Sequence, residues 1–265
     1  SEAISVANGT DALVLALLAF DIGEGDEVIT TPFTFFATAE AIDRVGAIPV
    51  FVDVDEHTYN IDPRKIEERI TSRTKAILPV HIFGQPAAMA DLNKIAKKHH
   101  LFVIEDACQA FGAMYNGRHV GSLGDAACFS FFPTKNLSTM GDGGMITTSN
   151  KTVARKIKSL RAHGSDKKYY HHEIGFNSRL DEIHAAILLV CLKYIDRWNE
   201  ERVALADRYS QSLKDVSSIK LPQTVKEGTH VYHLYCIQSN RRDEMMNDLE
   251  KQEISTGVYY PLPLH

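Results

Sequence analysis

The sequence has few cysteines, no long apolar run and no excess of positive charge. Its four cysteines are widely spaced and form no Cys-x-x-Cys pair, which argues against a zinc site or a disulfide framework and favours reduced cytoplasmic thiols. No apolar stretch approaches the roughly 18 residues that a membrane helix needs. The net charge of −5 gives no sign of the basic face of a nucleic-acid-binding protein. We therefore expect a cytoplasmic protein that binds neither membrane nor nucleic acid.

What is present is an ordinary globular composition, with 44% hydrophobic and 24% charged residues in 265. Such a chain can bury a substantial core. It opens at Ser1 without a methionine and stops at His265 directly after a Pro-rich turn. We expect that residues are missing from both sides.

Short apolar runs alternate with helix-length segments. The predicted strands are Ala3–Ala7, Val28–Thr30, Pro49–Val52, Ala76–Val80, Leu101–Ile104, Cys128–Phe131 and Met145–Thr148. The predicted helices between them include Asp11–Ala19, Phe36–Val45, Pro63–Ile70 and Met89–His99. Strands that are apolar almost throughout are typical of a sheet covered on both faces. The alternation therefore predicts an α/β fold with a mostly parallel sheet.

The spacing of apolar residues becomes helical from Leu180 to about Leu213, and the residues after it follow another pattern. Residues 230–265 predict a strand (Val231–Ile237), a helix (Asp243–Glu250) and a second strand (Thr256–Tyr260). We interpret residues 1–212 as a large domain and residues 213–265 as part of a small α+β domain.

Two strand ends carry groups suited to a ligand, because ligands of parallel sheets bind beyond the carboxyl ends of the strands. Asp106 follows the strand Leu101–Ile104, although an acid there can also be a plain helix N-cap. Lys135 follows the strand Cys128–Phe131, and a lysine is more often a solvated surface residue. Its apolar and aromatic flanks favour instead a desolvated, nucleophilic amine.

A third strand end predicts an anion site. Asn8, Gly9 and Thr10 open a helix directly after Ala3–Ala7, and the backbone N–H groups of a helix N-terminus attract anions. An ordinary capped turn is at least as common. Together with an acid 29 residues before a lysine (135 − 106 = 29), this turn suits pyridoxal 5′-phosphate (PLP). That cofactor needs a lysine for its aldehyde, a carboxylate for its pyridine nitrogen and donors for its phosphate.

The order of motifs resembles one known family. The matching stretches are Asn8–Leu13, Pro32–Thr38, Glu105–Ala110, Phe129–Leu137, Gly141–Gly144, Gly175–Glu182 and Tyr260–His265. The chain resembles the DegT/StrS family of sugar aminotransferases along essentially its whole length. The resemblance implies the type I PLP-transferase fold, in which a three-layer α/β/α large domain carries the cofactor.

The resemblance also implies roles for individual residues. Lys135 would hold PLP covalently as a Schiff base and move the proton, while Asp106 would pair with the pyridine nitrogen. The other implied cofactor contacts are Gln109 near the ring hydroxyl, Phe35 on the ring face, and Gly9, Thr10 and Ser130 at the phosphate. Asn177 would reach the cofactor of a neighbouring subunit, which implies a homodimer with shared active sites. His81 and His265 would lie toward the sugar, and no residue is expected to bind a metal.

The implied reaction moves an amino group from L-glutamate to a keto group of a nucleotide-linked keto-deoxy sugar. The stretches Gly175–Glu182 and Leu160–Ser165 look more like members acting on 3-keto sugars than on 4-keto sugars. Members that dehydrate sugars have histidine in place of the lysine, so Lys135 argues against that branch. Two alternatives remain: a non-catalytic PLP-binding regulator or sensor of the same family, and a PLP-dependent sugar dehydratase or lyase. The intact set Asp106, Gln109, Lys135 and Asn177 favours an enzyme over the regulator.

Overall fold

A seven-stranded sheet forms the centre of the computed structural model, which describes all residues 1–265. Its strands are β1 (Glu2–Val6), β2 (Glu27–Thr30), β3 (Ile48–Phe51), β4 (Thr74–Ile77), β5 (Phe102–Asp106), β8 (Ala126–Ser130) and β9 (Gly144–Thr148). They lie in the order β1-β9-β8-β5-β4-β2-β3. Only β9 runs against its neighbours, since it pairs antiparallel with both β1 and β8. The prediction of a mostly parallel sheet is confirmed.

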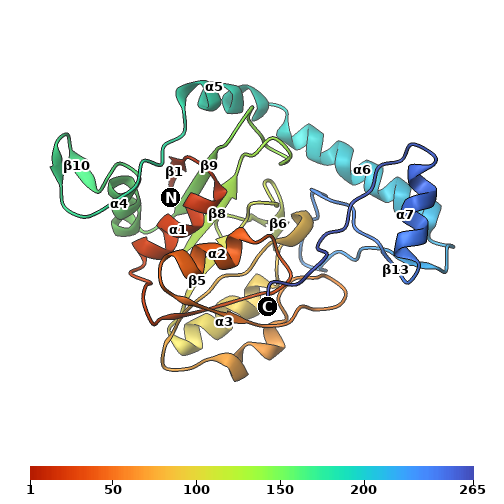
Figure 1. Ribbon diagram of the computed structural model, residues 1–265, viewed down its shortest axis with the longest axis horizontal. Helices are drawn as coiled ribbons and strands as arrows, with labels where there is room; N and C mark the ends of the chain where they lie inside the picture. The colour runs from red at the N-terminus through yellow and green to blue at the C-terminus, as the bar shows by residue number, and fades with distance from the viewer.

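Helices cover both faces of this sheet (Figure 1). On one face α1 (Gly9–Ala19), α2 (Ala37–Arg44) and α4 (Lys151–Leu160) share a core with side chains such as Val28 and Ile104. On the other face α3 (Met89–His99) packs on Ile29 and Val103, the adjacent residues of the same strands. Because successive side chains of a strand point to opposite faces, β2 and β5 each contribute to both cores. The predicted three-layer α/β/α arrangement is confirmed.

The helix predicted over Pro63–Ile70 is wrong. The chain forms two three-residue 3₁₀ turns instead, η1 (Pro63–Lys65) and η2 (Glu67–Arg69). Their hydrogen bonds run over three residues, from Ile66 N to Pro63 O and from Ile70 N to Glu67 O. The Asp62 carboxylate accepts from both the backbone N–H and the guanidinium of Arg64, which holds the first turn in its tight form. Asp62 caps this turn and Pro63 begins it, the arrangement typical of the start of a helix.

The last third of the chain has three helices and long irregular segments. It contains α5 (Glu182–Cys191), α6 (Ile195–Leu213) and α7 (Arg242–Glu250), and Figure 1 shows α7 at one end of the molecule. The remaining strands are two-residue or three-residue pieces: β6 (Met114–Tyr115), β7 (Arg118–His119), β10 (Ser165–Lys167), β11 (Tyr170–His171), β12 (Ile219–Lys220) and β13 (Gln238–Ser239). No helix combines the length and the apolar character that crossing a membrane requires.

The two strands predicted near the end of the chain, Val231–Ile237 and Thr256–Tyr260, are wrong. Both segments are irregular, and backbone groups of the first pair with the loop after β4 rather than with another strand. Val231 N donates to Gly84 O, and Leu234 N donates to Phe83 O. The apolar residues that suggested strands are thereby used to pack this segment against the loop after β4. The division into domains at residues 212 and 213 remains a prediction.

Candidate active site

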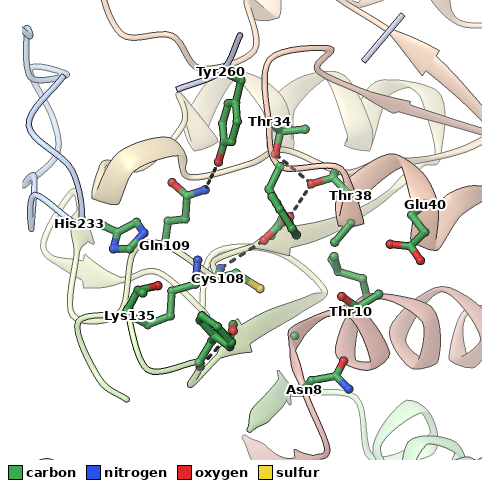
Figure 2. Close-up of a pocket in the computed structure, with 18 of the residues that line it drawn as sticks. Asn8, Thr10, Thr34, Thr38, Glu40, Cys108, Gln109, Lys135, His233 and Tyr260 are labelled. Atoms are coloured by element: carbon green, nitrogen blue, oxygen red, sulfur yellow. Dashed lines mark hydrogen bonds between the residues drawn. The ribbon is translucent and has the colours of Figure 1, made fainter. Parts of the chain in front are cut away.

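A cavity of about 760 Å³ lies beyond the carboxyl ends of β5 and β8. Its volume falls within the range of small-molecule sites. Seven of the residues predicted to act on a cofactor line it: Gly9, Thr10, Phe35, Asp106, Gln109, Ser130 and Lys135. Figure 2 shows Lys135, Gln109 and Thr10 entering this space from three different elements. The topology therefore brings together strand ends that are far apart in the sequence.

The turn between β1 and α1 forms one wall. Asn8 caps the helix by accepting from Asp11 N at 2.8 Å, and the first turn of any helix has N–H groups without intrahelical acceptors. Gly9 allows this turn to approach β8 closely, because a Cβ at that position would lie 2.7 Å from Ser130 Cβ and 3.0 Å from Cys108 Sγ. The result is a concave backbone surface with hydroxyls from Thr10 and Ser130 nearby, which suits a phosphate.

Asp106 ends β5, and its carboxylate is almost completely buried. Oδ2 accepts from the Thr38 hydroxyl at 2.8 Å, and Oδ1 accepts from the backbone N–H of Cys108 at 3.2 Å. Each oxygen has one donor from the chain and can accept another from a ligand. The side chain is therefore fixed at one end of the cavity and still able to receive an N–H.

Lys135 lies on a tight turn after β8, where its N–H donates to Phe132 O at 2.8 Å. The next residue anchors the turn, because Asn136 Nδ2 donates to Asn199 Oδ1 at 2.8 Å and to Val231 O at 2.9 Å. The amine is half-buried in the cavity beside Cys108 and His233, as Figure 2 shows. A lysine held by buried bonds at its neighbour, rather than free in solvent, suits a nucleophile.

Gln109 has a defined orientation. Its Oε1 accepts from the backbone N–H of Phe83 at 2.8 Å, so its Nε2 must point the other way, toward the Tyr260 hydroxyl at 3.0 Å. Burial raises the pKa of Tyr260 to about 12, which keeps that hydroxyl protonated near neutral pH. The cavity therefore contains an amide donor and a phenol side by side.

His233 also lines the cavity. Burial, and then the charge of Lys135, lower the pKa of His233 to about 3. Its Nδ1 is buried and has no hydrogen-bond partner within the chain. The imidazole is therefore neutral in this site near neutral pH.

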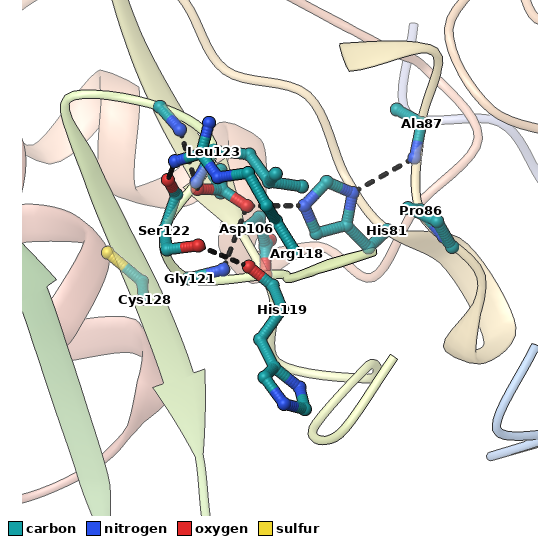
Figure 3. A network of polar contacts seen from close by, with 12 residues as sticks. His81, Pro86, Ala87, Asp106, Arg118, His119, Gly121, Ser122, Leu123 and Cys128 are labelled. Atoms are coloured by element: carbon teal, nitrogen blue, oxygen red, sulfur yellow. Dashed lines mark hydrogen bonds and ion pairs between the residues drawn. The ribbon is translucent and has the colours of Figure 1, made fainter. Parts of the chain in front are cut away.

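The structure contradicts the expectation that His81 faces a sugar. His81 is completely buried and does not line the cavity. Its Nδ1 accepts from Ala87 N at 3.0 Å, so its proton lies on Nε2, which donates to Glu105 Oε2 at 2.9 Å (Figure 3). Glu105 also accepts from the N–H groups of Gly121, Leu123 and Gly124. His81 thus joins loops behind the sheet and has no nitrogen left for a substrate.

Two further predicted residues lie outside the cavity. His265 is exposed and lies beside the ring of Phe51. Asn177 is exposed, and its Oδ1 accepts from the Arg179 guanidinium at 2.6 Å. An exposed Asn177 leaves its expected role toward a neighbouring subunit as a prediction.

Five of the cavity residues to which the sequence reasoning assigned no role matter for the geometry of the site: Thr34, Thr38, Cys108, His233 and Tyr260. Four of them lie inside the motifs that carried the family resemblance. Thr34 precedes α2 and Thr38 lies in its first turn, so their spacing in the sequence does not by itself bring the two side chains together. His233 had no signal beyond lying in an apolar segment that was interpreted as a strand.

The chain's groups fit PLP. A lysine amine, a buried carboxylate, an amide donor and a helix N-terminus with a glycine in close approach match the aldehyde, ring nitrogen, ring hydroxyl and phosphate. An exposed aromatic ring, Phe35, lies at the rim of the same cavity. The fold and the site together define an enzyme of the PLP-dependent aminotransferase class.

Comparison with known proteins specifies the family. Residues 1–265 match the DegT/DnrJ/EryC1/StrS aminotransferase family, and the chain belongs to it. It is 54% identical, over 99% of this chain and 71% of the relative, to a pleiotropic regulatory protein of Geobacillus stearothermophilus. It is 48% identical, over 100% of this chain and 72% of the relative, to UDP-N-acetyl-3-dehydro-α-D-glucosamine 3-aminotransferase of Acidithiobacillus ferrooxidans.

Solved structures agree. DesV of S. venezuelae, crystallised in complex with a ketimine intermediate, superimposes with a TM-score of 0.98 at 44% identity over 100% of this chain and 71% of DesV. NtdA of Bacillus subtilis, solved with bound PMP, has a TM-score of 0.92 at 38% identity over 100% of this chain and 62% of NtdA. The expected family and fold are confirmed.

Proposed function

We propose that this protein is a PLP-dependent aminotransferase that moves an amino group from L-glutamate to the keto group of a nucleotide-linked keto-deoxy sugar. The observation that carries the proposal is the convergence of Lys135, Asp106 and the Gly9 turn on one cavity, in a chain of this family. The four free cysteines fit action in the reducing cytoplasm.

Bound PLP would supply an aldehyde that takes up the amino group and a protonated ring that accepts an electron pair. The chain's own residues would position the cofactor and transfer the proton. Lys135 Nζ would anchor the cofactor and then carry the proton between substrate carbon and cofactor carbon. Asp106 would hold the proton on the ring nitrogen, and Gln109 Nε2 would donate to the ring oxygen. Phe35 would cover the ring face and exclude water from it.

The relatives favour the 3-keto position. The protein of Acidithiobacillus ferrooxidans is named as a 3-aminotransferase, and the sequence segments Leu160–Ser165 and Gly175–Glu182 independently look like members of that kind. We infer that this chain accepts a 3-keto sugar in preference to a 4-keto sugar.

A homodimer with shared sites belongs to the same proposal. Helix α5 is strongly apolar, yet only Leu188 among its ten residues is buried, and Ile183 and Leu189 are 75% and 66% exposed. A helix that is apolar on its outer side needs a partner surface. Ser178 accepts from Ala7 N at 3.1 Å, which places Asn177 next to the turn that leads into the phosphate site. A second copy bound to this face would have its cofactor near Asn177 of the first copy.

Sedimentation velocity tests the dimer. Ile183→Glu should give a monomer, whereas Ile48→Glu, at the exposed far edge of the sheet on β3, should remain a dimer. Mixing Lys135→Ala with Asn177→Ala subunits should restore turnover, because one site of each hybrid dimer would have both residues intact. Failure of the hybrid to exceed either parent would mean that the sites are not shared.

A regulatory role is the second candidate, because one close relative is named as a regulatory protein. The visible absorption of the protein with PLP, before and after L-glutamate, separates the two. An aminotransferase should show a visible band that Lys135→Ala lacks and that fades when glutamate delivers its amino group. A band that glutamate leaves unchanged would favour the regulator or another donor. Restoration of the band by 3-keto but not 4-keto nucleotide sugars would define the acceptor.

A further inference from the structure

Two buried threonines stand in a row behind Asp106. The Thr34 and Thr38 hydroxyl oxygens are 2.9 Å apart, and Thr38 Oγ1 lies 2.8 Å from Asp106 Oδ2. Thr38 is 1% exposed and Thr34 is 2% exposed, so solvent does not replace either hydroxyl. Figure 2 shows both threonines on the side of the cavity formed by the start of α2. The row connects the segment that leads into α2 with the end of β5.

The direction of the hydroxyl hydrogens follows from the charge of the carboxylate. An ionised carboxylate can only accept, so the Thr38 hydrogen must point at Asp106. Thr38 then has no hydrogen for its neighbour, and the hydrogen between the threonines must come from Thr34. Both O–H dipoles therefore point toward Asp106, and a buried row of this kind polarises along its length. The row stabilises the negative charge on the carboxylate and opposes its protonation.

Besides Thr38, the backbone N–H of Cys108 donates to Asp106, over the longer distance of 3.2 Å. The titratable neighbours of Asp106 add no constant positive charge. Burial raises the pKa values of the Cys108 and Cys128 thiols and of Tyr260, so all three are neutral near pH 7. Glu105 points to the opposite face of β5, where His81 and three backbone N–H groups bind it. Lys135 is the one cationic side chain that lines the cavity near β5. In the proposed reaction the Lys135 amine carries the proton, so its charge is not constant.

We propose that Thr38, supported by Thr34, is a positioning residue that keeps Asp106 ionised and thereby keeps the proton on the ring nitrogen of the cofactor. The inference rests on the proposed function. Without the row, the proton shared by the ring nitrogen and Asp106 moves to the carboxylate. The pair then becomes neutral, and the ring loses its ability to accept electrons.

A purely structural role predicts something different. If Thr38 only tethers α2 to β5, its loss lowers stability and leaves the protonation of the ring unchanged. Thr38→Val keeps the shape and removes the hydroxyl, whereas Thr38→Ser keeps the hydroxyl. Thr30→Val is a matched control, because Thr30 is also fully buried and donates over 2.8 Å to Leu78 O, away from Asp106.

The test is the ¹⁵N chemical shift of PLP labelled at the ring nitrogen and bound to each purified variant, which reports protonation directly. Wild type, Thr38→Ser and Thr30→Val should give the signal of a protonated ring. Thr38→Val should give that of an unprotonated ring and bind PLP about tenfold more weakly, as expected for one lost hydrogen bond to a charged group. Thr34→Val should move the signal part of the way, and should add nothing when Thr38 is already valine.

The outcomes separate the two proposals. Wild-type protein that binds no labelled PLP would overturn the proposed function. Wild type with a protonated ring and Thr38→Val with the same signal would overturn this inference, as would an equal shift in Thr30→Val. If Thr38→Val does not fold, the comparison of Thr34→Val with wild type decides, and an unchanged ring signal there counts against the proposal.

Discussion

The amide of Gln109 donates to the hydroxyl of Tyr260 across 3.0 Å and joins residues 151 positions apart in the chain. The backbone N–H of Phe83 fixes the other end of that amide, so it cannot flip. Phe83 adopts a left-handed backbone conformation with φ of 58°, which is rare for an aromatic residue. The strain at Phe83 therefore serves to orient Gln109 at the cavity.

The two hydrogen bonds of the Gln109 amide should contribute differently to the stability of the fold. Gln109→Leu leaves the buried Phe83 N–H without a partner and should lower the free energy of unfolding by about 1–3 kcal/mol. Tyr260→Phe frees only an amide hydrogen that faces the cavity, where water can accept it, and should cost less. Urea unfolding of both variants measures the difference. A larger loss in Tyr260→Phe would contradict this account of the orientation.

Gly9 should be essential for binding of the phosphate. In Gly9→Ala the new Cβ would press on Ser130 Cβ and Cys108 Sγ at the ends of β8 and β5, so the turn must move away from the site. We expect PLP and inorganic phosphate to bind at least about tenfold more weakly, as for the loss of one charged hydrogen bond. Gly23→Ala is the control, since its Cβ would make only an ordinary 3.6 Å contact with Val45 O. Equal titration curves for both variants would refute the close-approach argument.

The sequence predicted the strand ends well because a parallel sheet places its carboxyl ends along one edge. Asp106, Lys135 and the Asn8–Thr10 turn could therefore be assigned to one site without coordinates. The same reasoning missed Thr38 and His233, whose positions depend on how α2 and an irregular segment pack against the sheet. The role of His81 came from the family resemblance and not from this reasoning, and it is contradicted because the ring lies outside the cavity.

The predicted strands Val231–Ile237 and Thr256–Tyr260 show a related limit. Their apolar, β-branched and aromatic residues fit a strand, and local sequence gives no means of excluding it. In the structure Val231 and Leu234 bond to the loop at Phe83 and Gly84. Only the position of that loop, fixed by long-range contacts, decides which partner their backbone takes.

Glu105 and His81 should matter for stability and not for sugar binding. Burial opposes the charge of Glu105, but the hydrogen bonds from His81, Gly121 and Gly124 outweigh it and lower the pKa of the carboxyl. Glu105→Gln turns an NH₂ group toward these donors and should lower the free energy of unfolding by about 3 kcal/mol. Thermal melts and the KM for the keto sugar measure the two effects. An unchanged melt together with a raised KM would return His81 to the substrate site.

Acid should destabilise the fold through His230 before the carboxylates titrate. Burial lowers the pKa of His230 to about 3, and its Nδ1 accepts from Tyr232 N at 3.0 Å, which requires the neutral ring. In the unfolded chain a histidine takes up its proton near pH 6.5. Because the depressed pKa belongs to the folded state, stability is complete above pH 6.5 and is lost as the pH falls toward 3. The loss from this one residue is about 2 kcal/mol at pH 5.

His230→Asn isolates that contribution, since the amide oxygen of asparagine can replace Nδ1 as the acceptor and does not titrate. Urea unfolding at pH 7.5 and pH 5 should show a fall in stability that is about 2 kcal/mol smaller in the variant than in wild type. The window above pH 5 avoids the carboxyls of Glu27, Asp62 and Glu105, whose lowered pKa values place their effects at more acidic pH. Identical pH dependence in the two proteins would mean that His230 takes up its proton in the folded state as readily as in the unfolded chain.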